Sequence, residues 1–197
     1  MRKILSKEEE EKKRKRNNTI LVIVLGAVMV LGTLGYAIQG AGNYTTTGSS
    51  SEVDYRGFKF INQNGFWYLG NFTFSNTPPD IIQANQTTSN ISISISPLSS
   101  YQGFPVYIYS EDPSAQAEAT TNLGLVAQRI QNACPSDRNC SDLGDIPVKT
   151  CTDKFIIIET GNTSSITQDS GCVFIRGQRQ DLVALTDQWL FKTLGVM

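Results

Sequence analysis

The residue types that could carry out chemistry in this chain are few, because histidine is absent from all 197 positions. Its absence removes Ser–His and Cys–His nucleophile pairs, imidazole general bases and histidine metal ligands together. The chain also contains neither GxxxxGKS/T nor GxGxxG, the glycine-rich patterns that cradle nucleotide phosphates. Cysteines and carboxylates are therefore the reactive groups that remain.

The four cysteines are Cys134, Cys140, Cys151 and Cys172. An even number of cysteines in an oxidising compartment predicts two disulfides. Of the three connectivities we favour Cys134–Cys140 with Cys151–Cys172, because the first pair closes a very short polar loop. A zinc site built from all four thiolates is the alternative, although no two cysteines have the two-residue spacing of a zinc knuckle.

Two groups of carboxylates invite a functional interpretation. The acids around the cysteines offer oxygen ligands for Ca²⁺ but lack EF-hand spacing; they are Asp137, Asp142, Asp145 and Asp153. A second group, which could supply a glycosidase-like acid pair, is Asp80, Glu111 and Asp112. A solvated loop explains the first group, and helix capping and turns explain the second. We therefore predict no catalytic residue, no cofactor and no metal site, and enzymatic activity is disfavoured but open.

Aromatic side chains are dense between positions 66 and 109. They are Phe66, Trp67, Tyr68, Phe72, Phe74, Tyr101, Phe104, Tyr107 and Tyr109. On one face of a sheet such rings could stack a sugar or hold a peptide. Alternating aromatics in strands more often form a core, so binding is the less favoured interpretation.

The elements that would position these residues follow a stretch that we predict to be a transmembrane helix, residues 19–38. It contains no charge and no proline, and 20 helical residues span about 30 Å, the thickness of a bilayer core. Eight basic and four acidic residues precede it, whereas nine basic and 14 acidic residues follow it. Basic residues beside a membrane helix stay in the cytoplasm, which places the C-terminal part outside the cell membrane.

We expect this helix to be retained as a signal anchor, since it is longer than the apolar core of a signal peptide. Cleavage at Gly40-Ala41-Gly42 is the alternative. The bilayer is the partner of residues 19–38, and the acidity of the outer part excludes nucleic acid as its partner. A protein or glycan outside the cell is the partner that we expect for the domain.

Six Asn-x-Ser/Thr triplets follow the predicted membrane helix. Their candidate glycosylation sites are Asn43, Asn71, Asn85, Asn90, Asn139 and Asn162. A seventh match, Asn17, lies on the cytoplasmic side and is discounted. The number is suggestive of a glycoprotein where the host has the machinery.

The composition divides the chain into a basic cytoplasmic tail (1–18), the transmembrane helix (19–38), a Gly/Ser/Thr linker (39–52) and an extracytoplasmic domain (53–197). Within the domain, Asn64-Gly65 predicts a β-hairpin turn. We predict helices over about 113–133 and 182–194, and a central strand at 155–158 beside a neighbour at 172–175. The fold class is α+β: a mostly antiparallel sheet with two helices on one face, stapled by disulfides.

The segments GFKFINQNGFWYLG, FIII, CVFIRG and DQWLFKTLGVM, together with the basic tail and the spanning helix, resemble uncharacterised single-pass membrane proteins of small archaea. The resemblance covers most of the chain, in the order of its segments and in short stretches of sequence. It implies no activity or site residue. The sequence therefore predicts a cell-surface binding or envelope-structural module. The alternatives are an extracytoplasmic carboxylate-dependent hydrolase and an accessory subunit of a membrane complex.

Overall fold

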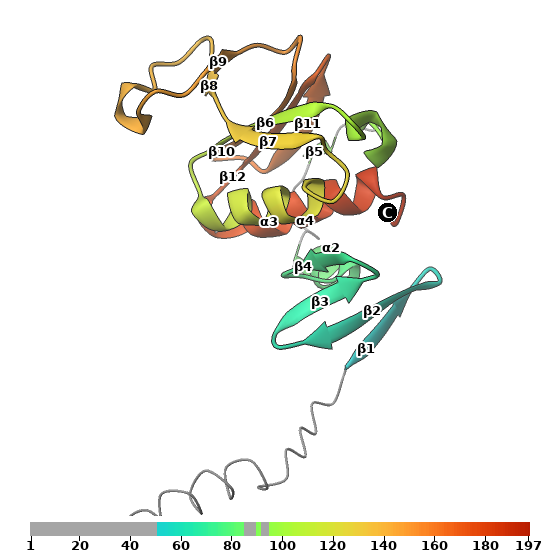
Figure 1. The fold of residues 1–197 in the computed structure, drawn as a ribbon. Coiled ribbons are helices and arrows are strands. Elements are labelled where there is room, and N and C mark those ends of the chain that lie inside the picture. The colour runs from blue at the N-terminus through green and yellow to red at the C-terminus, as the bar shows by residue number, and fades with distance from the viewer. Residues whose placement is uncertain (1–50, 85–89, 92–94) are drawn as a thin grey trace, which may run out of the picture. The chain divides into compact units, whose positions relative to one another are not determined.

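A computed structural model of the chain describes residues 51–84, 90–91 and 95–197 (Figure 1). The chain divides between Ser49 and Ser50, and the residues from Ser50 onward form one compact unit. The predicted tail, the predicted transmembrane helix and most of the predicted linker lie outside the described residues. Within the described residues, every helix is too short or too polar to cross a bilayer.

The described part begins with a four-stranded antiparallel sheet in the order β1-β2-β3-β4. Its strands are β1 (Glu52–Tyr55), β2 (Phe58–Gln63), β3 (Phe66–Leu69) and β4 (Phe72–Phe74). Asn64 and Gly65, with φ of 55° and 87°, turn the chain between β2 and β3. Both values lie in the left-handed region that a two-residue hairpin turn requires, so the predicted hairpin is confirmed.

A six-stranded sheet follows, in the order β5-β11-β12-β10-β6-β7. Its strands are β5 (Asn90–Ile91), β6 (Pro105–Ser110), β7 (Arg129–Asn132), β10 (Lys154–Thr160), β11 (Ser165–Asp169) and β12 (Cys172–Gly177). In this sheet only the β11–β12 pair is antiparallel, and the other four pairings are parallel. The expected antiparallel arrangement thus describes the first sheet, whereas the second is mixed because a helix returns the chain to lay β7 parallel to β6.

Within the described residues, three α-helices accompany the sheets: α2 (Pro78–Ala84), α3 (Pro113–Leu123) and α4 (Leu182–Thr193). Helices α3 and α4 lie together on one face of the six-stranded sheet, as expected (Figure 1). The additional helix α2, which the sequence did not predict, starts at Pro78-Pro79. Proline is favoured in the first turn of a helix, where its missing N–H has no partner to lose.

Helix α3 is shorter than the predicted 113–133 helix, and that prediction is wrong at its C-terminal end. The helix stops at Leu123 and Gly124 follows. A Cβ at position 124 would lie 2.9 Å from the backbone oxygen of Thr120, so the close backbone approach there requires glycine. The chain then turns into β7, where Ile130 pairs with Val106 of β6.

Strand β10 is the centre of the sheet and is buried on both faces, as predicted. Ile156 and Ile158 pack in the core with helices α3 and α4, whereas Phe155 and Ile157 pack in a second cluster on the other face. This alternation follows from the two-residue period of a strand. Its predicted neighbour is confirmed as β12, in parallel register.

The helices also contact the first sheet. The ring of Phe191 from α4 lies 5.5 Å from Phe60 and 4.5 Å from Phe74, measured between ring centroids. All three side chains are fully buried. The helical layer therefore joins the two sheets through one continuous core.

Both disulfides form with the predicted pairing. Cys134 bonds to Cys140, with Cα atoms 5.9 Å apart, and Cys151 bonds to Cys172, with Cα atoms 4.7 Å apart. All four thiols are consumed, which overturns the four-thiolate zinc alternative. The intervening segment contains two short paired strands, β8 (Cys134–Pro135) and β9 (Val148–Lys149). Three single 3₁₀ turns complete the described elements: η1 (Leu98–Tyr101), η2 (Ser141–Leu143) and η3 (Arg179–Asp181).

Candidate functional site

The predicted glycosylation sites fall into two sets. Asn71, Asn139 and Asn162 are exposed and lie outside regular strands and helices. Asn90 begins β5, and Asn43 and Asn85 lie outside the described residues. Exposure on a turn or loop is what attachment of a glycan to an asparagine requires, so the first three are the accessible candidates.

The acids considered for hydrolysis each have a structural partner. Asp80 accepts hydrogen bonds from the backbone N–H and the hydroxyl of Thr77, at 3.0 and 2.5 Å. Asp112 caps α3 by accepting from the backbone N–H of Ala115 at 2.9 Å. Glu111 accepts from the backbone N–H of Thr160 at 2.8 Å. Capping and turn contacts thus account for Asp80 and Asp112, whereas Glu111 is held by the end of β10. The structure shows no acid pair among the three.

The aspartates near the cysteines do not converge. Within the described residues, no group of three or more histidine, cysteine, aspartate or glutamate side chains could hold a metal ion. Asp153 forms an ion pair with Lys149, at 3.3 Å. The remaining three, Asp137, Asp142 and Asp145, are exposed. Their exposure agrees with the interpretation of this segment as a solvated loop.

A charged network lies at the ends of β6, β10 and β12. Glu159, which is only 4% exposed, contacts the guanidinium groups of Arg138 and Arg176. Arg138 also pairs with Glu111 at 3.1 Å. Although burial opposes it, the Thr160 contacts and the Arg138 charge lower the pKa of Glu111 below its usual value. Arg138 belongs to the loop closed by Cys134–Cys140, so we interpret this network as the anchor of that loop.

A different pair of acids meets between the two long helices. Glu118 of α3 accepts from the backbone N–H and the hydroxyl of Ser75, at 3.1 and 2.9 Å. Asp187 of α4 accepts from the backbone N–H and the side-chain amide of Asn76, at 2.9 and 2.8 Å. The exposed fractions are 9% for Glu118 and 0% for Asp187. Two consecutive residues after β4 are therefore held by carboxyl groups from two helices.

The second carboxyl oxygen of Asp187, Oδ1, has no N–H or hydroxyl donor among the described residues. Its neighbour is the carboxyl group of Glu118, and two carboxyl groups attract each other only when one of them carries a proton. Burial, followed by the interaction with Glu118, raises the pKa of Asp187 well above its usual value. The fold therefore favours the protonated, neutral form of Asp187.

Asn122, one turn beyond Glu118 on α3, fixes the adjacent strand. Its side chain accepts from the backbone N–H of Thr73 at 2.9 Å and donates to the backbone carbonyl of Thr73 at 2.7 Å. It also donates to the carbonyl of Glu118 at 2.9 Å. The side chain is fully buried, so this bidentate contact positions β4 against α3 beside the acid pair.

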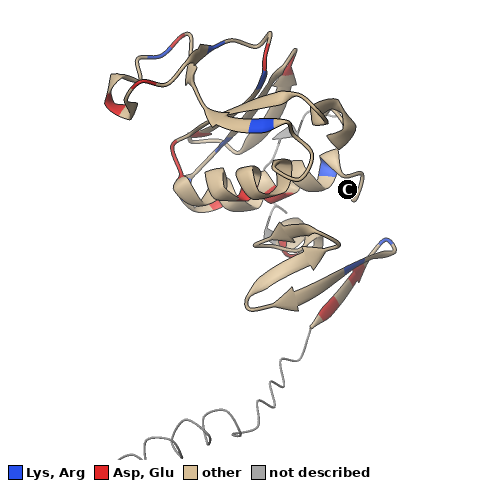
Figure 2. Cartoon of the chain, viewed as in Figure 1, with Lys and Arg blue, Asp and Glu red and all other residues tan. Residues whose placement is uncertain are grey.

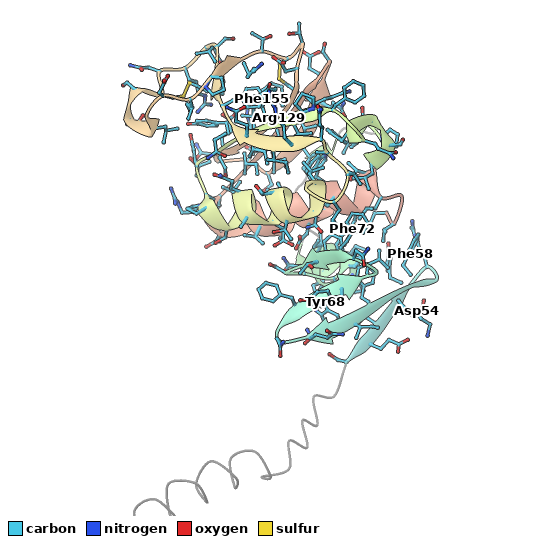
Figure 3. All side chains as sticks on the ribbon, in the orientation of Figure 1. Asp54, Phe58, Tyr68, Phe72, Arg129 and Phe155 are labelled. Carbon is cyan, nitrogen blue, oxygen red and sulfur yellow. A yellow bond between two sulfur atoms is a disulfide. The ribbon has the colours of Figure 1, made fainter. Side chains whose placement is uncertain are left out.

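A hollow of about 370 Å³ opens where β3 and β4 meet α3. Its lining residues are Phe66, Tyr68, Thr73, Ala117, Glu118 and Thr121. We call it the aromatic hollow. Phe66 is 47% exposed, and Tyr68 on β3 is labelled in Figure 3. In Figure 2 no basic segment lies on β3 or β4, whereas both long helices carry acidic segments.

The nine aromatics of the sequence separate into different environments. Trp67, Phe72 and Phe74 pack with the helical core, and Tyr107 and Tyr109 lie in the cluster on the other face of the six-stranded sheet. Only Phe66 and Tyr68 of the nine line the hollow. Most of the set is core, as the favoured interpretation expected, and two rings remain for binding.

No protein-family model, no curated protein and no solved structure matches this chain. Its site is therefore interpreted from its own geometry.

Sequence reasoning missed both members of the acid pair. A signal was present for each: Glu118 falls on the helical stripe of Ala115, Ala119 and Asn122, and Asp187 interrupts an apolar run on α4. An acid within a buried stripe indicates a partner elsewhere in the chain. The sequence does not indicate which residue that partner is.

Proposed function

We propose that the chain is a membrane-anchored extracytoplasmic protein whose outer domain is a ligand-binding module. The bilayer-length apolar segment at 19–38, with basic residues before it and acidic residues after it, supports the anchor and its orientation. Two disulfides within the described domain support an oxidising compartment. The exposure of Asn71, Asn139 and Asn162 is compatible with glycosylation of that domain.

The observation that carries the binding function is the aromatic hollow. Small-molecule sites are concave, lined mainly by aromatic and apolar side chains, and contain a few polar groups that orient the ligand. The hollow has this composition: the Phe66 and Tyr68 rings, the Ala117 methyl group, two threonines and one acid. Phe66 is nearly half exposed and lies beside the buried Glu118, so packing of the core does not explain its position.

The geometry favours binding over hydrolysis. A general acid must come within hydrogen-bonding distance of the group that it protonates. Asp187 is fully buried, and both Glu118 oxygens already accept hydrogen bonds from Ser75. The proposal of an accessory subunit depends on residues 19–38, which lie outside the described residues.

The binding function is tested with the oxidised outer domain, residues 50–197, on arrays of glycans and peptides. Phe66→Ser removes an aromatic wall of the hollow, and Phe104→Ser is the matched control, because Phe104 is 55% exposed and does not line the hollow. We expect a ligand that wild type and Phe104→Ser retain and Phe66→Ser loses. Binding that survives Phe66→Ser, or no binding at all, would contradict the proposal.

The orientation is tested with single cysteines placed on either side of the predicted helix, because the native thiols are consumed in disulfides. Ser50→Cys should react with a membrane-impermeant maleimide on intact cells. Ser6→Cys should react only after lysis. The reverse pattern would overturn the orientation.

A further inference from the structure

The aromatic hollow carries negative charge and has no basic side chain among its lining residues. Glu118 forms part of its wall, and burial favours the neutral form of its neighbour Asp187 by raising the pKa of that acid. Within the described residues, neither acid forms an ion pair with lysine or arginine. A ligand entering the hollow therefore meets one charge that the protein itself has not neutralised, and this favours a cation.

The aromatic walls favour the same ligand. A cation over the face of an aromatic ring is attracted by the negative potential of the π system. Elsewhere the protein covers its rings with its own cations: Lys149 lies 4.1 Å from the ring centroid of Tyr107, and Arg138 lies 5.2 Å from that of Tyr109. In the described part of the chain, no such cation lies over Phe66 or Tyr68.

The composition of the hollow distinguishes between kinds of cation. Mg²⁺ and Ca²⁺ need several oxygen ligands or retained waters, and the lining offers one carboxylate and two threonine hydroxyls, of Thr73 and Thr121. A weakly hydrated organic cation instead uses the aromatic faces and a single counter-charge. A volume of about 370 Å³ is within the usual range for small-molecule pockets.

We infer that the aromatic hollow binds an organic ammonium cation, with Phe66 and Tyr68 facing its alkyl groups and Glu118 supplying the counter-charge. This inference rests on the proposed binding function and names the class of ligand.

The test compares two probes of the same shape, choline and its uncharged carbon analogue 3,3-dimethylbutan-1-ol. Binding is measured by calorimetry on the full chain in a maltoside detergent, because a phosphocholine detergent would compete. We expect choline to bind at least about tenfold more tightly than the analogue, since only choline gains the cation–π and carboxylate interactions.

Two variants locate the interaction. Glu118→Gln keeps the shape and replaces the carboxylate that lines the hollow with a neutral amide. Phe66→Leu keeps the apolar character but removes the π face. Each should weaken choline binding about tenfold and leave the analogue nearly unchanged. Asp169→Asn is the matched control, because Asp169 is an exposed acid of β11 that does not line the hollow. Unchanged circular dichroism and thermal midpoints show that the variants are folded.

Equal affinity for choline and the analogue would overturn the cation inference and leave the hollow as an apolar binding site. Choline binding that Glu118→Gln and Phe66→Leu do not alter would place the cation elsewhere and also overturn the inference. If neither probe binds, the inference is wrong, while the proposed binding function is decided separately by the array experiment with Phe66→Ser.

Discussion

The carboxyl group of Glu118 on α3 meets that of Asp187 on α4, with both side chains withdrawn from solvent and both held by the residues that follow β4. Most buried acids are paired with a base, because burying a charge is costly. Here the partner is a second acid, and the raised pKa of Asp187 favours its protonated form. We therefore expect the stability of the interface between the first sheet and the helices to depend on pH.

The first prediction concerns Asp187→Asn. The new amide can accept from Asn76 and donate to Glu118, and it does not titrate. Because the folded-state pKa of Asp187 is raised, its favourable effect on folding is complete below its unfolded pKa and is lost as pH rises through the folded pKa. We expect the variant to be more stable than wild type by about 1 kcal/mol near pH 8 and not to be more stable near pH 4.

Urea unfolding of the outer domain at several pH values measures this difference. Gln116→Ala is a control, since its side chain makes one exposed hydrogen bond, to Asn132, and should shift stability by less than about 0.5 kcal/mol at every pH. If wild type and Asp187→Asn change in parallel between acidic and alkaline pH, the fold does not favour the protonated form of Asp187.

The second prediction concerns Asn122→Ala. The substitution leaves the N–H and C=O of Thr73 without their partner in a partly buried position, and each unsatisfied buried group costs about 1–3 kcal/mol. We expect a loss of about 2–4 kcal/mol in the free energy of unfolding. Hydrogen exchange should show the Thr73 amide among the most strongly accelerated. A uniform acceleration over β10 and β12 instead would mean that the effect is global.

The third prediction compares the two disulfides. Cys134 and Cys140 are 6 positions apart, and Cys151 and Cys172 are 21 positions apart. Since a longer closed loop restricts the unfolded chain more, removing the second bond as the double Cys→Ser variant should cost about 1 kcal/mol more than removing the first. Dithiothreitol should lower the thermal midpoint of wild type. No effect of dithiothreitol, or the reverse order of the variants, would contradict this account.

The parts of the fold that the sequence predicted correctly are those with strong local signals. Asn64-Gly65 specifies its own turn, the continuous apolar run Phe155 to Ile158 is typical of a strand buried on both faces, and α4 has a regular apolar stripe. The disulfide pairing followed from the short Cys134–Cys140 loop. None of these features depends on a distant segment.

The features that were not predicted depend on contacts distant in the chain. The apolar residues Leu123, Val126 and Ile130 have helical spacing, yet Ile130 belongs to a strand whose partner is β6. The parallel pairings of β6, β10 and β12 likewise join segments far apart. The acid pair is the extreme case, because Glu118 and Asp187 become neighbours only when α3 packs on α4.

The last prediction concerns Arg138→Ala and the acidic limb, that is, the loss of stability as the pH falls below neutral. The folded-state pKa of Glu111 is lowered, with Arg138 among the causes. Glu111 therefore stabilises the fold above its unfolded pKa, and this stabilisation is lost as pH falls through the lowered folded value. Arg138→Ala should raise that folded pKa and flatten the acidic limb, while it also destabilises the domain near neutral pH by leaving the buried Glu159 with Arg176 alone. Urea unfolding between about pH 3 and about pH 7 measures both effects. A stability that falls as steeply with decreasing pH as in wild type would show that Arg138 does not act on Glu111.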